Sequence, residues 1–153
     1  MHVTMVKKKM ADGSDCRKCA DVTAYLHARG FWGRIDEVVR AYAELTGDFN
    51  ELHVDDAVAG RSRFRGRIVH GMLTASLISR LIGMELPGRG TIYLQQSLRF
   101  TAPVRIGEEV EAAVEVTAVD VAKRRMTLST TIRRADGETV LTGEALVMVE
   151  GER

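Results

Sequence analysis

An acid and a histidine lie five residues apart in residues 47–55, which read Gly-Asp-Phe-Asn-Glu-Leu-His-Val-Asp. In a regular helix five residues turn through about 500°, so Asp48 and His53 would point in different directions. Their side chains can converge only if the backbone leaves the helix at Gly47 and follows a turn of the kind that Asp and Asn favour. A carboxylate and an imidazole that converge could hold and activate a water molecule. The spacing alone is also compatible with a surface turn that has no chemical role.

Two helices are expected to flank this stretch. The first has apolar residues at the spacing of an amphipathic helix, and Gly47 suits its C-terminal cap. The second, residues 72–86, opens at His70-Gly71 and is apolar on nearly every face. It is too short to cross a membrane, so we expect a helix buried in protein. The apolar positions of the first helix are Ile35, Val38, Val39, Tyr42 and Ala43.

Most of the remaining sequence alternates between apolar and polar residues, as expected for strands with one buried face. Residues 22–29 show this pattern, and four further strands are expected after Gly90, with a hairpin turn at Asp136-Gly137. A long apolar helix needs a surface to cover it, and an antiparallel sheet with one apolar face provides one. The sequence therefore predicts an α+β fold, in which a curved antiparallel sheet wraps around a long central helix.

The composition indicates a single globular domain. The chain has 153 residues, of which 45% are hydrophobic and 28% charged, and its formal net charge is +1. This balance argues against a nucleic-acid-binding protein, and no apolar run approaches the ~20 residues of a membrane span. We expect a flexible leader over residues 1–19, a domain over residues 20–153 and, without an apolar signal core, a cytoplasmic protein. Cys16 and Cys19 are interpreted as two reduced thiols, with a zinc ion shared between subunits as the alternative.

Two motifs at a fixed separation carry a family resemblance. Residues 47–55, followed by Gly-Arg-Ile-Val-His-Gly-Met-Leu-Thr-Ala-Ser-Leu-Ile-Ser over residues 66–79, resemble the hydratase 2 motif of MaoC-like (R)-specific enoyl-CoA hydratases. The likeness extends over about residues 22–150. Two residues depart from the family: Glu51 stands where it usually has proline, and Arg67 stands where it often has proline. The resemblance implies a hot-dog fold, a homodimer or higher homo-oligomer with sites near the subunit interface, and no metal or organic cofactor. The closest relatives it suggests feed β-oxidation intermediates into polyhydroxyalkanoate synthesis.

The resemblance also implies roles for individual residues. Asp48 and His53 match the catalytic pair of the family, and the expected product is an (R)-3-hydroxyacyl thioester. Gly71 is a candidate for the oxyanion contact, because helix N-termini carry unpaired N–H groups and glycine leaves them accessible. Ser79 aligns with a family serine near the active site. The structural alternative for Ser79 is a buried helical serine bonded to the carbonyl of Ala75.

Several nearby residues are expected to support the site. Asn50 is expected to fix the turn between Asp48 and His53, and His70 to be a structural or capping residue. The arginine-rich loop offers guanidinium groups that could meet the phosphates of coenzyme A, or that could simply be solvated. These arginines are Arg61, Arg63, Arg65 and Arg67.

The leading hypothesis is an (R)-specific enoyl-CoA hydratase that adds water to a trans-2-enoyl thioester or catalyses the reverse dehydration. The acyl carrier is left open between coenzyme A and acyl carrier protein. One alternative is a hot-dog acyl-CoA thioesterase, although proteins of that kind typically lack the Asp48–His53 pairing. The other is a non-catalytic regulator that binds acyl-CoA, against which the retention of both catalytic-type side chains argues.

Overall fold

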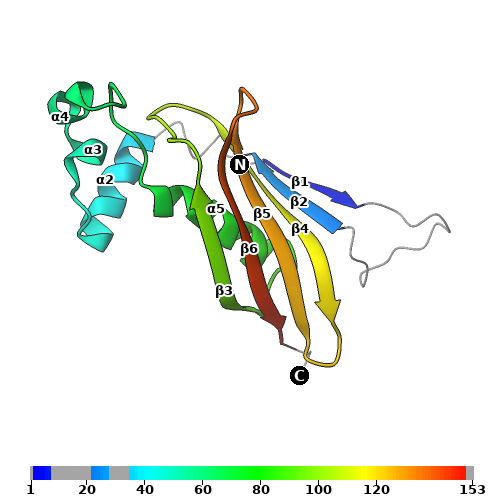
Figure 1. Ribbon diagram of the computed structural model, residues 1–153. Helices are drawn as coiled ribbons and strands as arrows, with labels where there is room; N and C mark the ends of the chain where they lie inside the picture. The colour runs from blue at the N-terminus through cyan, green and yellow to red at the C-terminus, as the bar shows by residue number, and fades with distance from the viewer. Residues whose placement is uncertain (1, 8–21, 28–34, 151–153) are drawn as a thin grey trace.

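The computed structural model describes residues 2–7, 22–27 and 35–150 (Figure 1). Short helices follow the first two strands, and the four longest strands follow the central helix. The elements are β1 (His2–Lys7), β2 (Val22–His27), α2 (Ile35–Thr46), α3 (Glu51–Val54), α4 (Asp56–Arg61), α5 (Gly71–Met84), β3 (Thr91–Phe100), β4 (Val110–Asp120), β5 (Arg125–Arg134) and β6 (Thr139–Val149).

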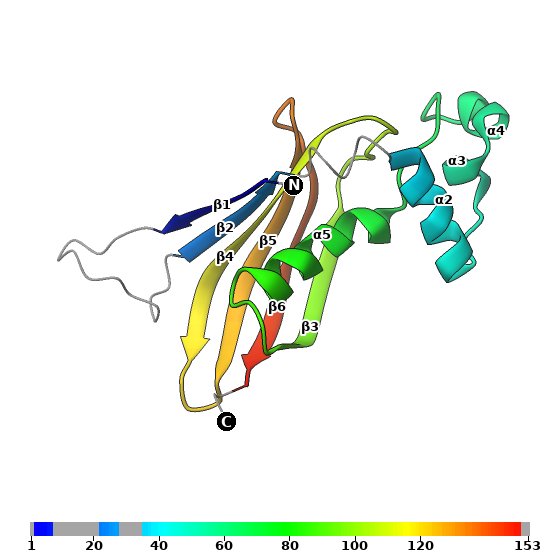
Figure 2. The ribbon, with the colours of Figure 1, turned by 180° about the vertical axis from the view of Figure 1, so that it is seen from behind.

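The strands form one antiparallel sheet in the order β1-β2-β4-β5-β6-β3. Figures 1 and 2 show the sheet curving, with α5 lying along its concave face. The predicted α+β arrangement of a curved sheet around a central helix is confirmed. One expectation needs correction: His2–Lys7 was assigned to a flexible leader, but it pairs with β2 as strand β1. Cys16 and Cys19 lie outside the described residues.

The core lies between α5 and the concave face of the sheet. Side chains on β4 alternate between buried and more exposed, so Val110, Ala112, Val114 and Val116 all face inward. They meet the inner side of α5, where each buried Leu or Ile contributes about 1.5–3 kcal/mol relative to an exposed one. The buried side chains of α5 are Leu73, Thr74, Ala75, Leu77, Ile78, Leu81 and Ile82.

The outer face of α5 is open in this chain, which differs from the expectation of a helix buried on nearly every side. Met72 and Met84 are 55% and 52% exposed, and Ser76 and Ser79 are exposed as well. The sequence pattern could not show this, because methionine and serine are compatible with a buried or an open face. In the described part of the chain, no helix has the length and apolar character needed to cross a membrane.

Helices α2, α3 and α4 form a three-helix segment beside the N-terminal end of α5, away from most of the sheet (Figure 2). The segment is anchored by Ile35, Val39 and Ala43 on α2 and by Ala59 on α4, all of which are buried. Helix α3 has no buried residue. The position of α3 is therefore set mainly by polar contacts and by its neighbours.

Candidate active site

The backbone break expected at Gly47 is present. Helix α2 ends there with Gly47 at φ +78°, and the Gly47 N–H donates to the Ala43 carbonyl at 2.8 Å. This left-handed conformation suits glycine, which has no Cβ to clash. The Asp48 carboxylate then accepts the Asn50 N–H at 3.3 Å, and the Asn50 side chain accepts the Leu52 N–H at 3.0 Å. Asn50 thereby caps α3 and fixes the turn between the acid and the histidine.

His53 on α3 has a defined tautomer. Its Nδ1 lies 2.8 Å from the carbonyl oxygen of Ile68, and a carbonyl can only accept, so Nδ1 carries the proton. Nε2 is then the nitrogen with the free lone pair. Burial, the largest cause, lowers the pKa of His53 below 6.5, and His70 lowers it further, whereas the Ile68 hydrogen bond and Asp48 oppose the shift. His53 is therefore neutral at pH 7 and able to accept a proton through Nε2.

His70 connects the two candidate catalytic residues. Its side chain is 2% exposed, its Nε2 donates to the backbone carbonyl of Asp48 at 3.0 Å, and its ring centroid lies 3.9 Å from that of His53. Nε2 is also 4.0 Å from the Asp48 carboxylate. His70 occupies the N-cap position of α5, and its backbone carbonyl accepts the Thr74 N–H at 3.0 Å, although its side chain makes no cap hydrogen bond. Its side-chain contacts fit the expected structural role.

The structure thus brings Asp48, His53 and His70 together, with one ligand-type atom of each within 4.8 Å of the others. Ligands of one tetrahedral zinc ion at ~2.1 Å would lie about 3.5 Å apart. The two imidazole rings are stacked at 31°, and His70 Nε2 already donates to a carbonyl. A metal ion held by all three side chains would therefore require a rearrangement.

A cavity of about 250 Å³ opens beside His53 and reaches the N-terminus of α5 at Gly71. The ring of Phe100 covers Gly71 so closely that a Cβ there would lie 3.0 Å from Cε1 of the ring. Thr74 adds a hydroxyl to a wall that is otherwise largely apolar. The cavity can hold an acyl chain with its polar end near the start of the helix. The apolar lining residues are Phe64, Ile68, Val69, Phe100, Ala102, Pro103, Val104 and Val140.

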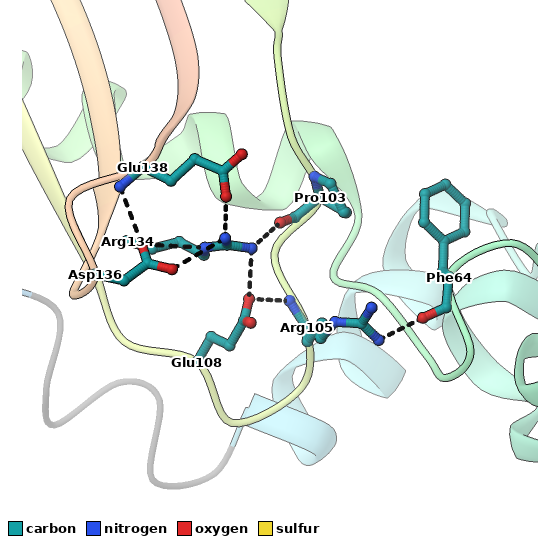
Figure 3. Close-up of polar contacts among 7 residues, drawn as sticks. All are labelled: Phe64, Pro103, Arg105, Glu108, Arg134, Asp136 and Glu138. Carbon is teal, nitrogen blue, oxygen red and sulfur yellow. Dashed lines mark hydrogen bonds and ion pairs between the residues drawn. The ribbon is translucent and has the colours of Figure 1, made fainter.

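A polar network holds two of these walls together (Figure 3). Arg105 donates its guanidinium to the Phe64 carbonyl and its backbone N–H to Glu108 at 2.8 Å. Glu108 pairs with Arg134 at 3.6 Å, and Arg134 donates to the Pro103 carbonyl at 3.4 Å. The β5–β6 hairpin is thereby linked to the loops that carry Phe64 and Pro103. The network therefore helps to hold the two cavity-lining residues Phe64 and Pro103 in place.

The arginine-rich loop divides into two kinds of side chain. Arg61, Arg63 and Arg65 are exposed, and Arg63 also lines the cavity. Arg67 differs from the expectation of a phosphate contact, because its guanidinium is bound to Asp36 at 2.5 Å and to Asp56 at 2.7 Å. The side chain of Arg67 is only 9% exposed. Sequence alone could not separate the four, because the carboxylate partners come from distant positions.

Ser79 lies outside the cavity, and the site includes two contributors that the sequence did not indicate. Ser79 is exposed on the outer face of α5 and does not line the cavity, so the alternative of a buried serine is wrong and its substrate-binding role stays a prediction. The Ile68 carbonyl, which orients His53, is a backbone group and leaves no signature in the sequence. Phe100 shows the alternation of a strand, but nothing in that pattern places its ring over Gly71.

A curved antiparallel sheet wrapped around a central helix defines a hot-dog fold, and here an acid and a histidine lie near the N-terminal end of that helix. Comparison with known proteins identifies the family. The family model described as "MaoC like domain" matches residues 14–137. The chain belongs to the MaoC-like family.

Individual relatives share long stretches of the chain. An (R)-specific enoyl-CoA hydratase from Aeromonas caviae is 53% identical over 109 residues, which cover 71% of this chain and 81% of that protein. A 3-hydroxybutyryl-CoA dehydratase from Methylorubrum extorquens is 49% identical over 111 residues, covering 72% and 70%. The solved structure of the (R)-hydratase from A. caviae involved in PHA biosynthesis superposes with a TM-score of 0.81 at 44% identity, covering 88% of this chain and 100% of that one.

Proposed function

We propose that the protein adds water to a trans-2-enoyl-CoA to give an (R)-3-hydroxyacyl-CoA, and that it catalyses the reverse dehydration. The observation that carries the proposal is the neutral, oriented His53 beside Asp48 at the mouth of a largely apolar cavity. The names of the A. caviae and M. extorquens relatives support the same reaction class. The chemistry uses side chains and backbone groups of this chain and needs no metal or organic cofactor.

The pair acts through one water molecule. The water donates hydrogen bonds to the Asp48 carboxylate and to His53 Nε2, which places its oxygen lone pair toward C3 of the substrate. As the water oxygen bonds to C3, one of its protons passes to the pair, and a proton from the pair is delivered to C2. The net change is the addition of one H and one OH across the double bond. Because both come from the same side, the addition occurs on one face of the alkene.

The thioester oxygen is placed at the start of α5. The N–H of Gly71, in the first turn, has no acceptor within the helix, and the helix dipole favours negative charge at this end. Negative charge develops on the thioester oxygen as water adds to C3, so a donor at that point lowers the barrier. Removing one oxyanion donor costs about 3 kcal/mol in other enzymes. The ring of Phe100 packs against Gly71, so the slot proposed for the thioester lies beside that ring.

Coenzyme A is the proposed carrier. Arg63 lies on the cavity wall, and Arg61 and Arg65 are exposed on the same loop, so their guanidinium groups are available to phosphate oxygens. Guanidinium and phosphate groups match each other in a bidentate geometry. An acyl carrier protein would offer these arginines only a single phosphodiester. Comparing crotonyl-CoA with a crotonyl group on acyl carrier protein tests this part of the proposal.

A second copy of the chain is proposed to complete the site. Strand β3 is an edge strand of ten residues, and Ile92 and Leu94 are 39% and 42% exposed on it. Exposed edges of this length pair readily with another strand. The side chain of Asp48 is 52% exposed in the single chain, although a catalytic carboxylate works best where bulk water is excluded. A homodimer formed along β3 would also cover the outer face of α5, where Ser79 lies.

One assay separates the proposed function from its alternatives. Purified protein is mixed with crotonyl-CoA in the presence of a metal chelator, and the enoyl absorbance and free thiol are followed together. Loss of absorbance without thiol supports the hydratase, whereas thiol release identifies a thioesterase. Binding with neither change identifies a non-catalytic acyl-CoA-binding protein. Dehydration of (R)- but not (S)-3-hydroxybutyryl-CoA tests the stereochemistry.

A further inference from the structure

Arg67 joins the three helices that the structure describes before the central helix. Its Nη1 contacts Asp36 in the first turn of α2 at 2.5 Å, and its Nε contacts Asp56 in the first turn of α4 at 2.7 Å. Nη1 also donates to the backbone carbonyl of His53 on α3 at 3.4 Å. A single guanidinium therefore bonds to α2, α3 and α4 at once.

The electrostatics favour this arrangement. Burial alone would lower the pKa of Arg67, but the hydrogen bonds to Asp36 and Asp56 raise it above its usual value. In return, the Arg67 hydrogen bond lowers the pKa of Asp36. A buried guanidinium is tolerated when its donors are satisfied by carboxylates, and the planar fork of arginine presents several donors to two carboxylates in a fixed geometry, whereas lysine offers a single flexible ammonium.

The backbone of Ile68, the residue after Arg67, also contacts helix α3. The N–H of Ile68 donates to the Leu52 carbonyl at 3.1 Å, and the Ile68 carbonyl accepts from His53 Nδ1 at 2.8 Å. Helix α3 spans four residues and buries none of them. The apolar side chains of α3, Leu52 and Val54, are only partly buried, so the polar contacts made by Arg67 and Ile68 are needed to fix where the imidazole of His53 points.

We propose that Arg67 is a positioning residue for catalysis: it holds α3 against the segment before α5, so that Nε2 of His53 faces the water site. The expected effect on kcat rests on the proposed function, the hydration of an enoyl thioester. The proposal assigns Arg67 a role distinct from binding the coenzyme A phosphates. It also explains why the guanidinium is covered while its three neighbours Arg61, Arg63 and Arg65 are exposed.

Kinetics on two substrates separates positioning from phosphate binding. Arg67→Met keeps much of the side-chain length but removes every donor, and crotonyl-N-acetylcysteamine is a thioester that lacks the phosphates of crotonyl-CoA. We expect kcat to fall by about 10- to 100-fold on both substrates with KM within about twofold, because small displacements of a catalytic group cost rates of this order. A loss confined to crotonyl-CoA, or a folded variant with an unchanged kcat, would overturn the proposal.

Two further variants serve as control and rescue. Arg40 pairs with the same Asp36 carboxylate at 3.5 Å but is 53% exposed, so Arg40→Met removes a positive charge near Asp36 without loosening α3 and is expected to keep the full rate. Arg67→Lys restores one contact and should recover part of the lost kcat. If Arg67→Met does not fold, Asp36→Asn weakens the Arg67–Asp36 ion pair at its half-exposed partner and should lower kcat in the same way.

A readout independent of activity completes the test. The NMR titration of His53 is expected to show its pKa moving toward 6.5 in Arg67→Met, because an imidazole no longer held in place becomes more hydrated. The Nδ1 proton should also exchange faster with water. If the wild type hydrates neither thioester, the proposed function fails while these signals still report on positioning. Unchanged signals in a folded Arg67→Met variant would overturn the positioning role by themselves.

Discussion

The Ile68 carbonyl oxygen lies 2.8 Å from Nδ1 of His53 and thereby decides which ring nitrogen is free for chemistry. The carbonyl belongs to the short segment that leads into α5, the helix whose first residue, Gly71, is the proposed oxyanion donor. The carbonyl that orients His53 therefore lies only three positions before the proposed oxyanion donor.

The pH dependence of activity should reflect His53. Its pKa is lowered in the folded protein, chiefly by burial, so protonation occurs only below the ordinary value of 6.5. The neutral base is thus kept over a wider range of pH, and the acid limb of kcat/KM should have an apparent pKa below 6.5. For the same reason, the contribution of His53 to stability is present above its unfolded pKa and lost as the pH falls through the folded pKa. A pH–rate profile checks this, and an acid limb at or above 6.5 would contradict the assignment of His53 as base.

Removing either member of the pair should be costly. Asp48→Asn and His53→Ala are each expected to lower kcat by at least ~100-fold, the usual scale of acid–base catalysis. Glu51→Gln is the matched control, because Glu51 is an exposed carboxylate of the same helix as His53. The three variants are compared on crotonyl-CoA after circular dichroism has shown that they are folded. Near-normal turnover in either pair variant would remove that residue from the mechanism.

Much of this site could be predicted from the order of residue types. Gly47 marks a break because a left-handed backbone favours glycine, and the break is what allows Asp48 and His53 to converge. The periodicity of α2 and the alternation of β4 follow from burying one face, so they are visible in the chain itself.

Contacts between distant segments could not be predicted in the same way. Arg67 and Arg63 are identical residue types four positions apart, yet one is bound to carboxylates of α2 and α4 and the other lines the cavity. Which arginine is covered depends on how those helices pack. The orientation of His53 likewise depends on a backbone carbonyl, and every residue has one.

Gly71→Ala should lower kcat/KM by about 100-fold while leaving the fold intact. A Cβ at this position would lie 3.0 Å from Phe100 Cε1, so the ring must shift into the slot proposed for the thioester. The donor N–H would remain but would be less accessible, and an oxyanion donor is worth about 3 kcal/mol. Gly83→Ala is the control on the same helix, since a Cβ there meets nothing within 4 Å. Equal kinetics for the two alanine variants would contradict the proposed approach of the thioester to the Gly71 N–H beside Phe100.

Placing a charge on the edge strand should test the proposed dimer. Leu94 is 42% exposed near the middle of β3, and Lys is a side chain that proteins use to prevent edge pairing. Leu94→Lys is expected to shift the sedimentation coefficient from dimer to monomer and to lower kcat, because the partner no longer shields the Asp48 side of the site. Val121→Lys, at a 74% exposed position beyond the end of β4, is the control and should change neither. A wild-type protein that is active and monomeric would contradict the interface.

Gly143→Ala should be the most destabilising of the glycine substitutions considered. Gly143 on β6 pairs with β3 opposite Leu98, and a Cβ there would clash with the backbone carbonyl oxygen of Ser97. A backbone group within a strand ladder cannot move aside as a side chain can, so β3 must shift or separate from β6. Overpacking of this kind typically costs 1–3 kcal/mol and sometimes more, and we expect about 3 kcal/mol here.

The measurement is thermal or urea unfolding at fixed protein concentration. A loss of about 3 kcal/mol corresponds to a fall in Tm of roughly 6–12 °C for a chain of this length. Gly60→Ala is the matched control, because Gly60 lies in α4, a Cβ there meets nothing within 4 Å, and alanine is the better helix former by about 1 kcal/mol. Since β3 carries both Phe100 and the proposed dimer edge, Gly143→Ala should also lower kcat/KM although it lies far from Asp48 along the chain. A variant as stable as the wild type would show that β3 and β6 can separate enough to admit a methyl group.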